Sequence, residues 1–273
     1  MAQKKRIAVS ISTYFCIPEQ GMVEFEILSR ASAFFVKCSN SSAFQSRFHL
    51  VTASHVIAPW RFPKYYPDDW LQFVNQSHTR HTIEFRDEDG FLTMETQLSP
   101  KSYHHTTRDL AVLHLDDEEQ ALEVFEMEGV EPQDLLKREL VEGEDLNFHG
   151  HDVAIPAAFG VDANIDAYIG EDSNSHIDST EDCRQPKPQI VKGFFFSQSA
   201  HQFFARTNPI LKYGMCGGPV TAKSSQTLTA GSMSRTSFTS SVCGMLEGIV
   251  PLESTNENIR GLASFVDSSV ITE

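Results

Sequence analysis

The chain alternates short apolar runs with polar turns along most of its length. Such runs, many of them rich in β-branched or aromatic residues, are typical of β-strands. An acidic turn at 87–90 separates two of them and indicates a β-hairpin. The pattern therefore predicts an all-β protein. The predicted strand segments are 23–28, 33–37, 49–57, 71–74, 81–86, 91–98, 108–115, 146–155, 190–196, 201–207, 242–250 and 261–265.

Four regions depart from this alternation. Residues 118–140 place apolar side chains at helical spacing with an interruption at Pro132, which predicts a helical linker. Residues 160–189 are rich in Asp, Ser, Asn and Pro and predict a surface loop. The Ser/Thr-rich residues 221–241 predict an insertion between strands, and 267–271 predict a short helix. A length of 273 residues suits two small barrels sharing an interface, or one large β-domain.

The net charge of −15 is concentrated in one segment. Residues 116–182 carry 21 acidic and 2 basic residues, whereas the rest of the chain is close to neutral. Without a basic stripe, the sequence argues against a nucleic acid as a direct partner. Segment 116–182 is predicted to be either a solvated linker or a docking site for a basic protein partner.

The five cysteines are odd in number and show no paired spacing. No Cys-x-x-Cys motif or His/Cys cluster indicates a metal site, and no cofactor motif is present. These features predict a reducing intracellular compartment, with the cytoplasm as the first choice and import into an organelle as the alternative. No apolar stretch approaches the roughly 20 residues of a membrane span, so no membrane association is expected.

Three segments carry candidate chemistry. The segment around His55 reads His-Leu-Val-Thr-Ala-Ser-His-Val-Ile, and an apolar run that begins at Asp109 reads Asp-Leu-Ala-Val-Leu. The segment around Cys216 reads Gly-Met-Cys-Gly-Gly-Pro-Val. A thiol attacks a carbonyl carbon well only as the thiolate. A neighbouring histidine can take the thiol proton, and an aspartate can hold that histidine in the required orientation. The three residues are therefore candidates for one nucleophilic site.

Together and in this order, the segments resemble the trypsin/chymotrypsin-like peptidase family. The first is similar to the Thr-Ala-x-His signature of trypsin-like and Deg/HtrA-like proteases, and the second to the Asp-(Ile/Leu)-Ala-(Leu/Val) strand. The third matches Gly-x-(Ser/Cys)-Gly-Gly-Pro, with cysteine as in the picornavirus-type cysteine proteases. The resemblance covers about residues 23–266.

The resemblance implies a chymotrypsin-like double β-barrel with a short helical, acidic linker between the barrels. Residues 1–20 would be an N-terminal extension. Residues 21–117 would form the first barrel with the histidine and the aspartate. Residues 118–140 would be the linker, and 141–273 the second barrel with the nucleophile.

The resemblance also implies roles for the site residues. His55 would take the proton of the Cys216 thiol and return it to the leaving amine, while Asp109 would hold the second ring nitrogen. The backbone N–H groups of Gly214 and Cys216 would form the oxyanion hole. Met215 stands where trypsin has the aspartate of its zymogen switch, so that switch is absent.

Specificity is carried over from the same resemblance. Ile210 falls at the base of the pocket, where the lack of an acid argues against selection of Arg or Lys. Residues 243–249 resemble the strand that holds the substrate backbone, which makes Glu247 and Gly248 substrate-binding candidates. The histidine with which viral relatives select glutamine has no counterpart, because no histidine follows His201.

The leading hypothesis is a cysteine endopeptidase acting on peptide or protein substrates. The second is a pseudoprotease that uses the double barrel as a protein-binding module or a subunit of an assembly. The third is a hydrolase or acyl transferase that acts on another ester or amide. A cleft filled by Ile210, Tyr213 or the loop at 160–189 would favour the binding module.

Overall fold

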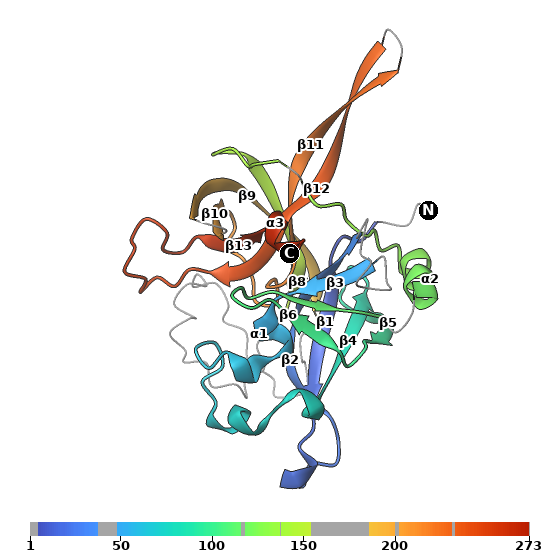
Figure 1. The fold of residues 1–273 in the computed structure, drawn as a ribbon, viewed down its shortest axis with the longest axis vertical. Helices are drawn as coiled ribbons and strands as arrows, with labels where there is room; N and C mark the ends of the chain where they lie inside the picture. The colour runs from blue at the N-terminus through green and yellow to red at the C-terminus, as the bar shows by residue number, and fades with distance from the viewer. Residues whose placement is uncertain are drawn as a thin grey trace.

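The computed structural model describes residues 5–37, 48–115, 118–136, 138–153, 186–199, 202–230 and 233–272, with only the backbone for 118, 224–230 and 233–239. The described chain is mostly β-structure. It forms a seven-stranded antiparallel sheet and a closed six-stranded barrel (Figure 1). The prediction of an all-β protein is therefore confirmed. Cys38, Cys183 and most of the predicted loop at 160–189 lie outside the described residues.

The seven-stranded sheet comes from the N-terminal part of the chain, and its strand order is β5-β4-β1-β2-β3-β7-β6. The N–H of Ser99, just beyond β5, donates to the carbonyl of His114, just beyond β7, at 3.0 Å. The sheet therefore curls back on itself. Its strands are β1 Val9–Phe15, β2 Glu26–Lys37, β3 Phe48–Thr52, β4 Thr79–Arg86, β5 Leu92–Gln97, β6 Ser102–His104 and β7 Ala111–Leu113.

The barrel closes in the order β10-β13-β12-β11-β8-β9. Its strands are β8 Asp145–Asp152, β9 Lys187–Ser199, β10 Gln202–Thr207, β11 Pro219–Ala230, β12 Met233–Ile249 and β13 Ala263–Asp267. The described helices are short: η1 Pro18–Gln20, α1 Ser54–Ile57, η2 Pro59–Arg61, η3 Asp69–Phe73, η4 Gln76–His78, α2 Glu118–Glu128 and α3 Ser268–Ile271.

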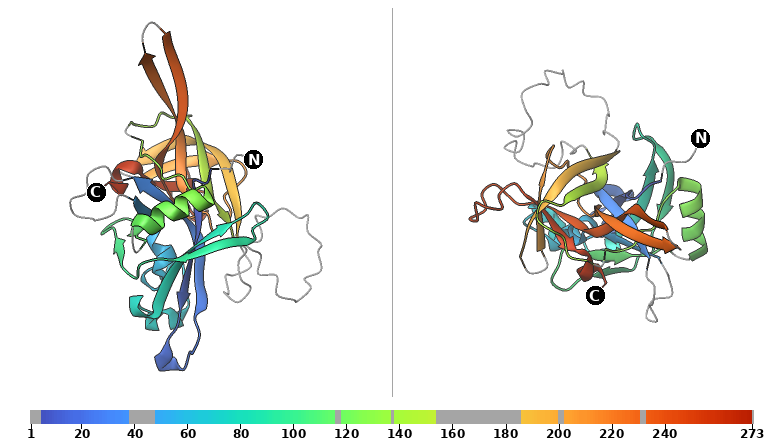
Figure 2. Two further views of the ribbon diagram at one scale, coloured as in Figure 1. Left: turned by 90° about the vertical axis from the view of Figure 1, so that its right-hand side faces the viewer. Right: turned by 90° about the horizontal axis from the view of Figure 1, so that it is seen from above.

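Aromatic rings pack against one another in both bodies of the fold, the seven-stranded sheet and the barrel. In the barrel, the ring of Phe265 meets those of Phe148 and Phe203 edge to face. Helix α2 lies beside the sheet and packs Phe125 against Phe35 and Phe48, with ring centroids 4.8 and 4.9 Å apart (Figure 2). Edge-to-face contacts of this kind add to the free energy of burying the rings. The helical segment expected between the two bodies is thus docked on the sheet.

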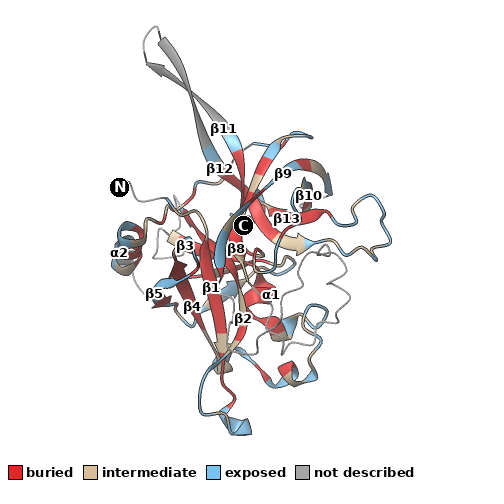
Figure 3. Cartoon of the chain, turned by 180° about the vertical axis from the view of Figure 1, so that it is seen from behind, coloured by how far each residue is buried: buried red, intermediate tan, exposed pale blue. Residues whose placement is uncertain are grey.

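The prediction that residues 1–20 form an extension is wrong. Strand β1 pairs with β2 on one side and β4 on the other, in the middle of the sheet. Val9 and Ile11 belong to the core, and the alternate residues Ser10 and Ser12 are fully buried as well (Figure 3). Serines interleaved with apolar residues suggest a half-exposed segment, because sequence alone does not reveal that the polar face is covered.

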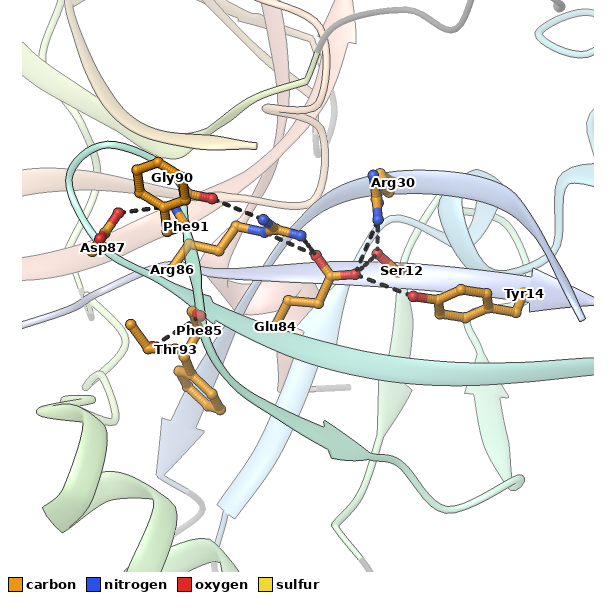
Figure 4. A network of polar contacts seen from close by, with 10 residues as sticks. All are labelled: Ser12, Tyr14, Arg30, Glu84, Phe85, Arg86, Asp87, Gly90, Phe91 and Thr93. Atoms are coloured by element: carbon orange, nitrogen blue, oxygen red, sulfur yellow. Dashed lines mark hydrogen bonds and ion pairs between the residues drawn. The ribbon is translucent and has the colours of Figure 1, made fainter. Parts of the chain in front are cut away.

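The polar face of β1 contacts a buried ion-pair network around Glu84 (Figure 4). Ser12 Oγ donates to the Glu84 carboxylate at 2.5 Å, and the guanidinium of Arg86 lies 2.6 Å from it. Arg30 is 3.6 Å away. Burial alone would raise the pKa of Glu84, but the hydrogen bond from Ser12 and the charges of the two arginines lower it. The carboxylate is therefore ionised inside the fold.

Two further predictions about local structure are wrong. Residues 71–74, expected as a strand, overlap η3, because Leu71 and Val74 are both buried at a spacing of three, which one 3₁₀ turn places on one side. The insertion expected at 221–241 is instead the continuous pairing of β11 with β12, whose register extends to Ala230 opposite Met233. This hairpin projects from the barrel (Figure 1).

Other local predictions are confirmed. The hairpin expected around 81–98 is formed by β4 and β5, and its turn is held by the Asp87 carboxylate, which accepts from the N–H groups of Asp89 and Phe91. The short helix expected at 267–271 is α3. Between the two bodies the chain passes through α2 and an irregular stretch before β8 begins.

We expect Glu84→Gln to destabilise the fold by about 3 kcal/mol, because it leaves Arg86 buried without its carboxylate. Urea unfolding followed by circular dichroism measures this. The pKa of Glu84 lies below its ordinary value in the folded state. The contribution of the Glu84 carboxylate to the free energy of unfolding is therefore present above the ordinary pKa and is lost as the pH falls through the folded-state pKa. The difference from wild type should shrink in acid.

The exposed Glu253 supplies the matched control, and Glu253→Gln should change the free energy of unfolding by less than about 0.5 kcal/mol. A Glu84→Gln variant as stable as this control would contradict a stabilising role for the network.

Candidate active site

His55 and Asp109 meet because their strands pair. His55 follows the end of β3 in α1, and Asp109 lies just before β7. The register of β3 with β7 places Thr52 opposite Ala111. Asp109 then accepts twice from His55: from the backbone N–H at 2.8 Å and from ring atom Nδ1 at 2.5 Å. The carboxylate thus fixes both the position and the orientation of the ring, with Nδ1 facing Asp109.

A second contact supports the same junction. Ser54 Oγ donates to the carbonyl of Leu110 at 2.8 Å and lies 3.0 Å from Nδ1 of His104. The residues flanking His55 and Asp109 are thereby linked directly. This role of Ser54 was not predicted from the sequence. A serine beside a histidine carries no signal of it.

Cys216 completes the group. It is partly buried in the loop between β10 and β11, and a Cβ added to Gly248 of β12 would lie 4.0 Å from its Sγ. Burial alone would lower the pKa of His55. Hydrogen bonds to Asp109 and to Cys216, together with the charges of both residues, raise it to about 10. The imidazolium is thus the favoured form of His55 at neutral pH.

The glycines around Cys216 are required by space and by backbone conformation. Gly214 and Gly217 have φ of 84° and 80°, where side chains are disfavoured. A Cβ on Gly214 would lie 2.2 Å from a methyl of Val153. A Cβ on Gly217 would lie 2.3 Å from Thr52 Oγ1. The motif therefore lets the loop pass close to β3, the strand that precedes His55.

Hydrogen bonds tie down four consecutive carbonyl groups of this loop. Tyr213 accepts from Val153 N–H at 2.8 Å, Gly214 from Ser32 Oγ at 2.6 Å, Met215 from Gly218 N–H at 3.0 Å, and Cys216 from Ser32 N–H at 3.0 Å. In a trans peptide the N–H points away from the carbonyl. The N–H groups of Gly214 and Cys216 donate to no acceptor among the described residues. They are available to bind an oxygen anion.

The other candidate residues lie in different settings. Ile210 is 56% exposed, and Tyr213 is 43% exposed. Glu247 accepts hydrogen bonds from Gln202 Nε2 at 2.6 Å and from Ser264 Oγ at 3.1 Å. Burial, followed by the charge of Asp109, raises the pKa of Glu247. Its carboxyl group is therefore bound to β10 and β13, whereas the adjacent Gly248 borders Cys216.

Aromatic rings flank the imidazole. The ring centroids of Phe62, Tyr65 and Tyr66 lie 6.1, 5.0 and 6.3 Å from that of His55. Only 7% of the surface of His55 is exposed. Burial and the nearby charges of Asp109 and Cys216 raise the pKa of both tyrosines, so their hydroxyls stay protonated. Segment 60–70, which contains these three aromatic residues, thus forms a wall of the site.

The remaining described cysteines differ from Cys216. Cys16 and Cys243 are buried and unpaired, and burial raises the pKa of the Cys243 thiol. A buried thiol of raised pKa is a poor nucleophile. Within the described ranges no group of three or more His, Cys, Asp or Glu side chains is arranged to hold a metal ion.

Comparison of the sequence with models of protein families and with curated proteins finds no match. Among the described residues, no helix has the length and apolar character needed to cross a membrane.

We expect Cys216→Ala to lower the pKa of His55, because the variant removes one anion and one hydrogen bond that favour the imidazolium. An NMR titration of the histidine rings measures this. In the wild type, the stabilisation from charged His55 is complete below the ordinary pKa of 6.5 and is lost as the pH rises towards 10. In the variant, this loss should begin at a lower pH.

His49 is the internal control. Burial and the neighbouring His114 lower its pKa to about 4, and the removal of Cys216 should leave that value unchanged. An unchanged midpoint for His55 in Cys216→Ala would show that the thiol and the imidazole are not coupled.

Proposed function

We propose that this chain is a cysteine endopeptidase with a chymotrypsin-like double β-barrel. The observation that carries the proposal is the sequence of contacts from Asp109 through His55 to Cys216, beside two unoccupied loop N–H groups. A closed six-stranded barrel next to a curled antiparallel sheet supports the fold assignment. The nucleophile and the histidine come from different bodies, as the resemblance implies.

The proposed reaction follows from this geometry. The Cys216 thiolate attacks the carbonyl carbon of the substrate, which forms the C–S bond and places the negative charge on oxygen. The N–H groups of Gly214 and Cys216 bind that oxygen, and each such donor contributes about 3–4 kcal/mol to transition-state stabilisation. Nδ1 of His55 is held by Asp109, so the proton for the leaving amine comes from Nε2. Water then hydrolyses the thioester with His55 as base.

Gly248 supports a binding mode for the peptide. Its position beside Cys216 leaves the end of β12 uncovered by a side chain at the nucleophile. An extended substrate can add to a strand edge through main-chain hydrogen bonds. Ile210 and Glu247 are the proposed neighbours of the substrate side chains.

A binding module without turnover is the second candidate. The observation that favours it is the burial of His55 beneath the Tyr65 ring, whose centroid is 5.0 Å away. A substrate must displace or pass this ring to reach the imidazole. Neither Ile210 nor Tyr213 is buried, so neither fills the site. The same geometry also permits acyl transfer from other esters or amides, because it does not name the acyl group.

We expect iodoacetamide to alkylate Cys216 at neutral pH faster than the other cysteines, because the imidazolium of His55 stabilises its thiolate. Peptide mapping by mass spectrometry measures each rate. His55→Ala should slow alkylation of Cys216 by about tenfold or more, and Cys243→Ala should leave it unchanged. Equal rates in wild type and His55→Ala would remove the basis of the proposed mechanism.

A peptide-library digest separates the endopeptidase from the binding module. The wild type should cleave library members, and Cys216→Ala should lose at least about 10³-fold of that activity. Rapid alkylation without cleavage, together with stoichiometric capture of a peptide, would favour the binding module.

A further inference from the structure

Ser32 of β2 joins the seven-stranded sheet to the nucleophile loop. Its N–H donates to the carbonyl of Cys216 at 3.0 Å, and its Oγ donates to the carbonyl of Gly214 at 2.6 Å. Ser32 is itself held from the histidine side, because Thr52 Oγ1 donates to its carbonyl at 2.8 Å. One fully buried serine therefore contacts two carbonyls of the loop and the strand that precedes His55.

The direction of the Ser32 hydroxyl is determined. The N–H of His151 donates to Ser32 Oγ at 2.9 Å, and a carbonyl oxygen such as that of Gly214 can only accept. The hydroxyl proton must therefore point at Gly214. Ser32 itself is fully buried, whereas Gly214 is half-buried, so Ser32→Ala takes from the Gly214 carbonyl a donor that the protein alone supplied.

We propose that Ser32 is a positioning residue, whose hydroxyl keeps the loop in the conformation that holds an oxyanion. The proposal rests on the proposed function and deepens it. The hydroxyl holds the carbonyl end of the peptide unit that follows Gly214, while its N–H end, that of Met215, donates to the Lys212 carbonyl over a longer 3.4 Å. A glycine at φ of 84° rotates more easily once the shorter of these two bonds is lost. Rotation there misplaces the N–H groups of Gly214 and Cys216. The Ser32 N–H remains in any substitution, so Ser32→Ala isolates the hydroxyl.

Two reagents separate this role from a general structural one. Iodoacetamide alkylates Cys216 by displacement at carbon, with loss of iodide and without an oxyanion. p-Nitrophenyl acetate acylates Cys216 through a tetrahedral oxyanion: the C–S bond forms, the C–O bond breaks, and p-nitrophenolate leaves. Ser32→Ala should alkylate within about twofold of wild type. Its acylation should be slower by about tenfold to 100-fold, with Cys216→Ala as the blank.

Ser10→Ala is the matched control. Ser10 lies directly opposite Ser32 in the β1–β2 register and is equally buried, and its hydroxyl has no hydrogen-bond partner among the described residues. It should acylate and alkylate like wild type. Equal acylation by Ser32→Ala and Ser10→Ala, or a parallel loss of both reactions in folded Ser32→Ala alone, overturns the proposal.

The test remains decisive if Ser32→Ala fails to fold, as judged by circular dichroism. The side chains introduced by Ser32→Thr and Ser32→Val have nearly the same shape as each other, and only threonine keeps the hydroxyl. Faster acylation in Ser32→Thr at equal alkylation supports the proposal, and equal acylation in the two variants overturns it. A wild type that alkylates rapidly but does not acylate contradicts the proposed function itself, which distinguishes the two failures.

Discussion

The contact between β2 and the loop around Cys216 is the constraint on which the candidate site depends. His55 and Asp109 belong to the seven-stranded sheet and Cys216 to the barrel, so their relative position is only as precise as this junction. Ser32 bonds the loop from the sheet side. Gly217 then lets the loop approach Thr52 to a distance that excludes any side chain. The hydrogen bonds from Ser32 and the close approach of Gly217 to Thr52 thus both fix the position of the Cys216 loop relative to the sheet.

Charge governs the site once the geometry is set. Burial disfavours an imidazolium, yet the pKa of His55 rises because a carboxylate and a thiol lie on its two sides. The neighbouring tyrosines feel the same negative charges and keep their protons. The aromatic wall excludes water from the imidazole, which strengthens its electrostatic interactions with Asp109 and Cys216. Burial and ion pairing therefore act in opposite directions on the pKa of His55 but together strengthen the coupling.

The sequence indicated the three candidate residues of the site better than the residues that support them. His55, Asp109 and Cys216 stand in recognisable local patterns; strand pairing brings the first two together, and the contact of the loop with β2 adds the third. Ser32 and Ser54 stand in no recognisable pattern, because each is an ordinary serine whose partners are distant in sequence or belong to the main chain. The same limit explains the error at residues 1–20. A strand with serines on one face looks partly exposed until the Glu84 network that covers this face is known.

Met215 shows how such a loop can be ordered without a charge. In the trypsin-like pattern that the sequence resembles, this position is an aspartate that needs a new N-terminus as its partner. Here the side chain is fully buried in the barrel core. A Cβ on Gly150 of β8 would approach the Met215 backbone to 3.0 Å, so the barrel wall is packed directly against the loop. Apolar burial of Met215 on one side and the Ser32 bonds to the carbonyls of Gly214 and Cys216 on the other hold the loop in place. The free N–H groups of Gly214 and Cys216 are the consequence of that arrangement, and they exist without an ion pair to create them.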